Sequence, residues 1–291
     1  MIGATLATGK PGTEDRILRP ILIVSTPRSG STLLFETLAR APGLFTTGRE
    51  SHMRIEQVAD FHPGQRGWSS NRLDAADASP AAVKDLGEKF YAALRDRGGQ
   101  PATGEVRMLE KTPKNALRVP FFDAAWKDSL FVYLYRDPRQ ALASMIQAWL
   151  SGRFVTYPQL PGWGLPSWSL LLVPGWPELR DRPLPEIAAR QWATTTDILV
   201  GDLMQISPDR VVAIDYDELS NDPQATILRL TRRLDLQWDL QLGAALPLSR
   251  YTHEPPSPDK WRRFQAEIET VWSLVEAADA KARAFMKAAH R

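Results

Sequence analysis

Cysteine is absent from the 291-residue chain, and histidine, with four residues, is scarce. Without cysteine there can be no disulfide, no thiolate nucleophile and no zinc site built from thiolates. The histidines form no HExxH motif and no close pair at the spacing of metal ligands, so the sequence predicts no metal site.

Long apolar runs and a strong charge of either sign are missing as well. No segment approaches the roughly 18 consecutive apolar residues of a membrane-spanning helix, and the N-terminal residues lack the apolar stretch of a signal peptide. Lysine and arginine total 36 against 34 acidic residues, a net charge of +2, which gives no broad basic face for a nucleic acid. We therefore expect a cytoplasmic protein that neither spans a membrane nor binds nucleic acid.

The apolar residues that are present, 43% of the chain, predict strands alternating with helices. Short apolar runs predict strands buried on both faces at 21–24, 106–109, 130–135 and 211–214. Helical spacing predicts helices over 80–95, 138–150, 187–203 and 223–234, and from 261 onward. This alternation predicts an α/β domain in which helices flank a mostly parallel sheet.

The chain length fits one large domain, which we place at residues 20–291. Residues 1–19 show no periodicity and are expected to form a flexible lead-in. The tract 156–186 contains seven prolines and three tryptophans, so it cannot form a long helix and its tryptophans must be buried against something. It is expected to be an insertion: an apolar lid or wall of a binding site, a covering of the core, or a contact in a homodimer.

The loop TPRSGST at 26–32 joins the first predicted strand to a helix. Such a loop gathers backbone N–H groups and a helix N-terminus around one point, which suits an anion. Gly30 permits close backbone approach, Arg28 adds a positive fork, and Ser31 and Thr32 add hydroxyl donors. The loop lacks the first glycine and the lysine of the nucleotide-triphosphatase motif. The alternative is an ordinary capped turn.

A second candidate anion site follows the strand at 130–135. Arg136 ends the strand, Asp137 is expected to cap the next helix, and Ser144 lies about two helical turns further on. Arg136 and Ser144 can therefore face one side. Ligands in open α/β sheets bind at the carboxyl ends of the strands, which is where both candidate sites fall.

The pair TPRSGSTLL (26–34) and YRDPRQALASMI (135–146) resembles the two signatures of sulfotransferases that use 3′-phosphoadenosine 5′-phosphosulfate, abbreviated PAPS. The resemblance implies a P-loop-type fold with PAPS as co-substrate. It implies that the first segment (Arg28, Ser29, Gly30, Ser31 and Thr32) holds the 5′-phosphosulfate, and that Arg136 and Ser144 hold the 3′-phosphate.

Three weaker matches to the same family occur in the family's order. EKTP at 110–113 resembles the segment whose lysine, here Lys111, lies near the transferred group. DYDEL at 215–219 is similar to the strand end whose tyrosine, here Tyr216, touches the adenine. DKWR at 259–262 resembles a late loop, here with Lys260 and Trp261, that closes over the cofactor. Each also has a plain structural alternative: a solvated lysine, a core tyrosine and a core tryptophan.

The resemblance is strongest to the tyrosylprotein and tetratricopeptide-linked branches. The cytosolic drug-conjugating branch uses a histidine as base in the central segment, where this chain has Pro113. The other branches place a glutamate behind a glycine after the loop, and Glu50 matches that pattern with one residue's difference in spacing. Glu50 is therefore expected to be the general base. His52 competes for that role, since histidine is the commonest proton carrier near neutral pH, or it is a plain loop residue.

The implied activity is transfer of a sulfuryl group from PAPS to a hydroxyl of a small-molecule or peptidic acceptor, with Arg28 and Lys111 serving the leaving group and no metal. The tryptophans of 156–186 favour an acceptor with an apolar or aromatic part. Two other functions stay open at this point: a P-loop kinase with an altered loop, and a nucleotide-binding module without catalysis.

Overall fold

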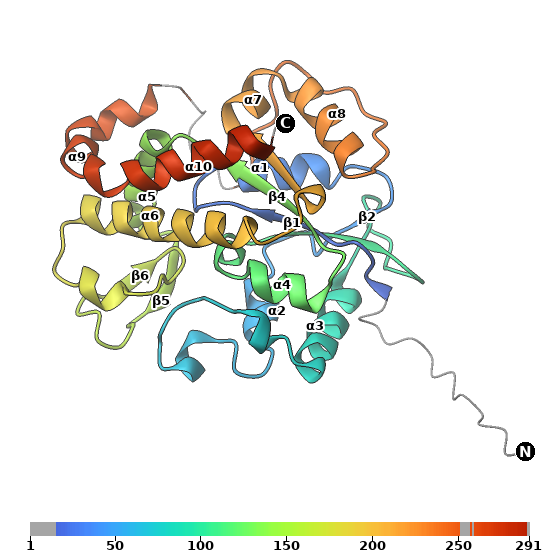
Figure 1. Ribbon diagram of the computed structural model, residues 1–291, viewed down its shortest axis with the longest axis horizontal. Coiled ribbons are helices and arrows are strands. Elements are labelled where there is room, and N and C mark those ends of the chain that lie inside the picture. The colour runs from blue at the N-terminus through green and yellow to red at the C-terminus, as the bar shows by residue number, and fades with distance from the viewer. Residues whose placement is uncertain (1–15, 251–256, 258, 290–291) are drawn as a thin grey trace, which may run out of the picture.

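The computed structural model describes residues 16–250, 257 and 259–289 (Figure 1). Its centre is a five-stranded sheet in which every pairing is parallel, in the order β2-β3-β1-β4-β7. The strands are β1 (Ile21–Val24), β2 (Leu44–Phe45), β3 (Arg107–Lys111), β4 (Leu130–Tyr135) and β7 (Val211–Asp215). The α/β class with a parallel sheet is confirmed.

Apolar side chains cover the sheet on both faces, as the uniformly apolar strand sequences predict. Along β1, Ile21 and Ile23 face one core cluster while Leu22 and Val24 face the other. The first cluster packs under α1 (Ser31–Leu38) and α8 (Pro223–Arg233). Helices on the second side are α2 (His52–Glu56), α3 (Pro80–Ala93), α4 (Val119–Ala125), α6 (Leu184–Leu203) and α10 (Glu276–Ala289). Figure 1 shows α1 and α8, with α7 (Tyr216–Asn221), above the sheet and α2 to α4 below it.

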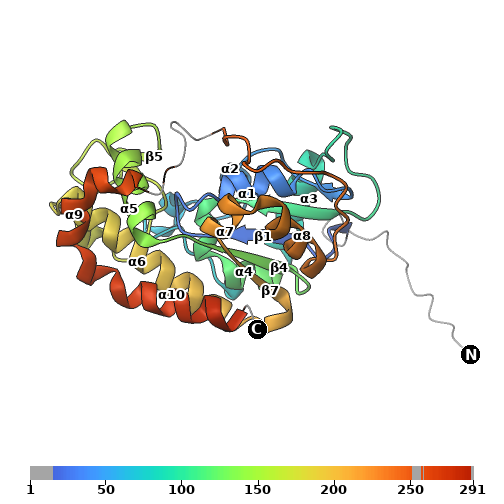
Figure 2. The same cartoon turned by 90° about the horizontal axis from the view of Figure 1, so that it is seen from above.

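A further layer adjoins the end of the molecule to the left in Figure 1. It comprises α5 (Pro138–Ser151), the antiparallel hairpin of β5 (Val155–Pro158) and β6 (Ser167–Ser169), and α9 (Gln265–Thr270). Asp137 caps α5 as expected, since its side chain accepts a hydrogen bond from the Arg139 amide. Figures 1 and 2 both show α10 lying beside α6.

The tryptophans of 156–186 form a small core of their own. Trp163, Trp168 and Trp176 are each at most 4% exposed, and each indole N–H donates to a backbone carbonyl. Their rings pack edge to face, with centroids 4.8 Å apart for Trp163 and Trp168. The tryptophans therefore form the core expected by one alternative and support the β5–β6 hairpin from within. Leu170 and Leu171 of the same tract line the cavity described below, and a role of the tract as a lid or wall stays a prediction.

Three boundaries differ from those predicted. Of the expected lead-in, residues 1–15 lie outside the described part, while Ile17 is 1% exposed and pairs with Val106, so 16–19 pack with the domain. β3 continues through Glu110 and Lys111. Because both residues are charged, the apolar pattern predicted that the strand ends at residue 109. The stretch from 260 to 289 is divided into two short 3-10 helices, α9 and α10, rather than one helix.

Candidate functional site

The carboxyl ends of four strands bring the sequence-predicted residues to one edge of the sheet. The loop 26–30 follows β1, Lys111 ends β3, Arg136 follows β4 and Tyr216 follows β7. A cavity of about 680 Å³ opens there. Its lining includes these candidates: Arg28, Gly30, Ser31, Thr32, Glu50, His52, Arg136, Ser144, Tyr216, Lys260 and Trp261.

The loop after β1 is held in an unusual backbone conformation. Arg28 has a φ of 66° and Gly30 a φ of 92°, both in the left-handed region that favours glycine. No side chain caps α1, so the N–H groups of its first turn are left to bind a ligand or water. A Cβ on Gly30 would lie 2.4 Å from two ring carbons of Tyr216, so glycine is required there by space as well as by φ.

Arg28 and Arg136 meet in this cavity from two different strand ends. One guanidinium nitrogen of Arg136 donates to the Arg28 carbonyl at 2.9 Å, and its Nε donates to Gln140. Arg28 Nε donates to the Ser144 hydroxyl at 3.2 Å, and its guanidinium stacks over the Phe154 ring. Burial and the nearby Arg136 charge lower the pKa of Arg28. Neither arginine has a carboxylate within 4 Å among the residues described, so the pair presents unneutralised positive charge.

Tyr216 contacts both the loop after β1 and the segment after β4. Its ring lies 4.2 Å from the Arg136 guanidinium carbon and covers Gly30 from the other side. It also packs in the core beneath α8, as the structural alternative predicted, while its contact with an adenine stays a prediction. Ser29 is placed differently from its loop neighbours, because it is fully buried, shares a 2.7 Å hydrogen bond with Thr26 and does not line the cavity.

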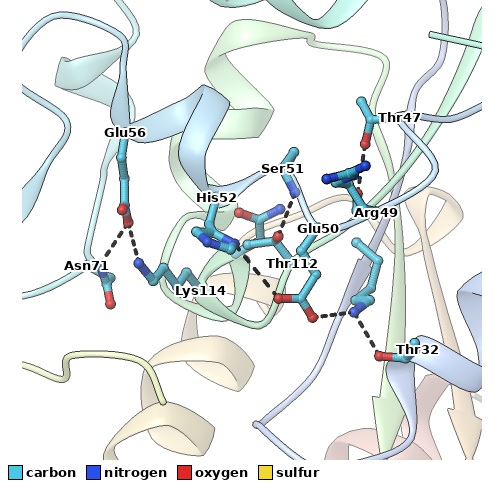
Figure 3. A network of polar contacts seen from close by, with 12 residues as sticks. Thr32, Thr47, Arg49, Glu50, Ser51, His52, Glu56, Asn71, Thr112 and Lys114 are labelled. Carbon is cyan, nitrogen blue, oxygen red and sulfur yellow. Dashed lines mark hydrogen bonds and ion pairs between the residues drawn. The ribbon is translucent and has the colours of Figure 1, made fainter. Parts of the chain in front are cut away.

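Lys111 connects Thr32 of the loop to Glu50; Figure 3 labels Thr32 and Glu50. Its Nζ donates to the Thr32 hydroxyl at 2.9 Å and to Glu50 Oε1 at 2.6 Å. The lysine side chain is 2% exposed, which excludes the alternative of a solvated lysine. One cation therefore lies between the anion loop and the carboxylate that the sequence predicts to be the base.

His52 lies beside the other oxygen of that carboxylate. Its Nδ1 is 3.8 Å from Glu50 Oε2, beyond hydrogen-bond distance. Burial and the Lys114 charge lower the pKa of His52 from its ordinary value, which favours the uncharged imidazole. Position and charge state leave His52 a competitor for the role of proton acceptor.

Lys260 and Trp261 reach the same cavity from the 3-10 helix Lys260–Phe264. The Trp261 ring lies 5.7 Å from the Arg139 guanidinium carbon and packs partly against α5. The late segment thus lines the same cavity as the two candidate anion-binding segments. Its closing over a cofactor stays a prediction.

Sequence reasoning missed a buried polar cluster at the other end of the cavity, which we call the Lys114 cluster: Glu56, Asn71, Lys114, Arg118 and Tyr157. Lys114 Nζ donates to Glu56 Oε1 at 2.7 Å and to the Tyr157 hydroxyl at 2.9 Å. Its members come from four separate segments, which hides the cluster in the sequence. One signal was available: His52 and Glu56 are four residues apart on α2 and so share a face.

A second missed group lies behind Glu50. Glu110 is buried at the end of β3, where its Oε1 accepts hydrogen bonds from the Ser51 hydroxyl and from Asn115. The Ser51 amide donates to Thr112, which fixes the backbone beside Glu50 against β3. Burial raises the pKa of Glu110 to about 7, although the Ser51 hydrogen bond opposes the shift.

The arrangement has three parts along one cavity. Cationic side chains and free amides lie at the strand ends, a Lys111–Glu50 pair lies beside them, and polar and apolar groups line the rest. In the described part of the chain, no three His, Asp or Glu side chains gather as metal ligands would. No helix in that part is both long enough and apolar enough to cross a membrane.

Comparisons with known proteins relate the chain to one family. A family model described as the sulfotransferase family matches residues 20–240. A Caenorhabditis briggsae protein assigned by its name to the protein-tyrosine sulfotransferases is 23% identical over 224 residues, which cover 76% of this chain and 67% of that protein. The sulfotransferase domain of the olefin synthase from Synechococcus PCC 7002 has a TM-score of 0.50 at 18% identity, over 92% of this chain and 98% of the other, and is similar in fold. Since the family match spans most of the chain and contains both candidate anion-binding segments, the chain belongs to the sulfotransferase family.

Proposed function

We propose that the protein transfers a sulfuryl group from PAPS to a hydroxyl group of an acceptor. The observation that carries the proposal is the pairing of Arg28 and Arg136, two guanidinium groups from different strand ends that line one cavity without a facing carboxylate in the described chain. Partly buried cations without a carboxylate partner in the described chain suit a ligand with negative groups, and PAPS has such groups at both ends.

The residues present fit such a donor. Gly30 leaves space that any side chain would fill, beside the uncapped start of α1, and Tyr216 offers a flat ring next to Arg136. Arg28, Ser31 and Thr32 would hold the 5′ end, while Arg136 would hold the 3′-phosphate. Ser144, which now accepts from Arg28, would share that second role.

The chain's residues suit in-line transfer. A new bond forms between the acceptor oxygen and sulfur, while the bond from sulfur to the bridging phosphate oxygen breaks and its electron pair leaves with 3′,5′-ADP. The acceptor's proton passes to Glu50, whose carboxylate faces the cavity. Lys111, held between Thr32 and Glu50, would stabilise negative charge that grows on the leaving oxygen. Membership of the sulfotransferase family favours this reaction over the phosphoryl transfer left open by the sequence.

The acceptor half of the cavity supports a hydroxyl compound with an apolar part. Its apolar lining comes from α2, the region of β5 and β6, and the segment before residue 250: Met53, Phe154, Leu170, Leu171, Leu246 and Leu248. A small molecule or an exposed peptide side chain fits this description.

Isothermal titration with 3′,5′-ADP and with 5′-AMP tests the proposal. We expect 3′,5′-ADP to bind roughly tenfold or more tightly than 5′-AMP, because the extra phosphate gains charge-assisted hydrogen bonds. Transfer of radiolabelled sulfate from PAPS to a phenol panel tests the reaction itself. Equal affinity for the two nucleotides would contradict the proposal.

A further inference from the structure

The Lys114 cluster has no part in the function proposed above, although it adjoins the candidate base. Glu56, Lys114 and Tyr157 line the cavity, as does His52. Figure 3 shows His52 between Lys114 on one side and Glu50 on the other. The cluster therefore lies on the acceptor side, away from the loop after β1.

Charge within the cluster is not balanced. Lys114 and Arg118 have side chains 7% and 0% exposed, and both bind the same carboxylate oxygen, Glu56 Oε1, at 2.7 and 3.1 Å. Neither has a second carboxylate within 4 Å in the part of the chain described here. Two buried cations and one buried anion leave a charge of +1 in a place where unpaired charge is costly.

Lys114 is the cation that a ligand can reach. Arg118 is fully buried and does not line the cavity, whereas Lys114 does. An ammonium has three N–H donors, and Lys114 uses two of them, for Glu56 and the Tyr157 hydroxyl. Burial and the Arg118 charge lower the pKa of Lys114 to about 8, while Glu56 opposes the shift, which agrees with incomplete compensation.

We propose that the acceptor carries a carboxylate, which binds Lys114 while the acceptor hydroxyl lies at Glu50. This inference rests on the proposed function. One carboxylate brings the cluster to two positive and two negative charges. A single spare donor and a single excess charge fit a monoanion better than a dianionic phosphate. The substrate class is thus a small hydroxy acid whose apolar part lies against the cavity wall.

The test compares hydroxy acids with their neutral amides, beginning with 3-(4-hydroxyphenyl)propionate and 3-(4-hydroxyphenyl)propionamide and including aliphatic pairs. Binding to protein saturated with 3′,5′-ADP is measured by titration, and sulfuryl transfer by KM. We expect at least one acid to bind roughly tenfold more tightly than its amide. In Lys114→Met the preference for the acid over its amide should vanish, while amide binding stays unchanged. Glu56→Gln changes the charge of the cluster in the opposite direction, so in this variant the preference for the acid should increase.

Stability gives a second readout. Lys114→Met leaves Glu56 and Arg118 as a balanced pair, so its melting temperature should equal or exceed that of the wild type, whereas a lysine that only supports the fold would lower it on removal. The inference is overturned if acids and amides bind equally throughout the panel, if the preference survives in Lys114→Met, or if that variant is strongly destabilised. Tight 3′,5′-ADP binding and transfer to neutral phenols would then still support the proposed function, while loss of both would count against that function instead.

Discussion

Glu110 is a single carboxyl group that links stability to the position of the candidate base. Its side chain is fully buried and accepts a hydrogen bond from the Ser51 hydroxyl, while its Oε2 has no hydrogen-bond partner. Ser51 follows Glu50 in the chain, so Glu110 helps to fix the backbone from which the base projects. Burial raises the pKa of Glu110 to about 7 from its ordinary value of 4.5.

Glu110→Gln should therefore flatten the pH dependence of stability. Between pH 4.5 and about 7 the folded protein holds a proton on Glu110 that the unfolded chain releases, so the free energy of unfolding falls as pH rises through this interval. Over this interval the ionisation of Glu110 lowers the free energy of unfolding by about 3 kcal/mol. Glutamine resembles the protonated acid and cannot ionise. Urea denaturation at pH 5 and pH 7.5 measures the difference, and equal slopes for both proteins would show that Glu110 ionises normally.

Glu50→Gln should reduce turnover by roughly 10²–10⁴-fold, the usual contribution of a general base. Affinity for 3′,5′-ADP should stay near that of the wild type, because Glu50 faces the acceptor side. His52→Asn is the matched variant, since the two side chains are neighbours and only one is expected to accept the proton. Steady-state sulfuryl transfer measures both, and a larger loss in His52→Asn would move the base to the histidine.

Single residues were predictable where a short segment carries the chemistry. Arg28 and Arg136 each follow an apolar strand, and the fold brings them together. Lys114 and Glu56 were missed because a lone lysine or glutamate in a sequence indicates a surface position. Their burial depends on partners such as Tyr157, far along the chain.

Among the elements, the loop between β1 and α1 depends most closely on a distant segment. Gly30→Ala would place a Cβ 2.4 Å from the Tyr216 ring, so either the ring leaves Arg136 or the loop shifts. We expect binding of 3′,5′-ADP to weaken by about tenfold or more, through loss of about one charge-assisted hydrogen bond.

Gly43→Ala is the control for that variant. Gly43 has a φ of 76°, similar to the 92° of Gly30, but a Cβ there would meet nothing within 4 Å. Both variants should lose about 1–2 kcal/mol of stability from backbone strain. Only Gly30→Ala should also lose ligand affinity, as titration and denaturation together would show. Equal affinities would rule out the contact with Tyr216 as the cause.

Strands with wholly apolar sequences were predictable, and short strands with mixed sequences were not. The runs at 21–24 and 130–135 match β1 and β4 residue for residue because both faces of these strands are buried. The β5–β6 hairpin was missed because its prolines and exposed positions obscure the alternation of a strand. The segment from residue 260 onward is interrupted by the 3-10 helix Trp272–Leu274. The Trp272 ring contacts the Arg139 guanidinium, which lies far away in the sequence, so this interruption could not be predicted from the local pattern.

At the scale of the whole molecule, the cavity joins the ends of four strands, so a bound nucleotide should stabilise the entire domain. At 100 times its dissociation constant, 3′,5′-ADP adds about 2.7 kcal/mol to the free energy of unfolding. For a chain of this length that raises the melting temperature by about 4 °C. Differential scanning calorimetry with and without the nucleotide measures this shift.

Arg136→Ala should lose most of that stabilisation at the same nucleotide concentration. Removing its charged hydrogen bonds weakens binding by about 1.5–3 kcal/mol, which leaves less than half of the shift. The unliganded variant should melt near the wild type, because Arg136 has no carboxylate partner within 4 Å in the described chain. A full shift in the variant would place the nucleotide elsewhere.

The last described helix, α10, has a consequence for how the protein is made. Its Ala282 and Met286 complete the core on one face of the sheet, and its Asp279 accepts a hydrogen bond from Tyr135, the residue before Arg136. A nascent chain on the ribosome would therefore hold the strand end at Arg136 uncovered until residue 286 has emerged. The strand end that precedes Arg136 is therefore completed only after α10 has been synthesised.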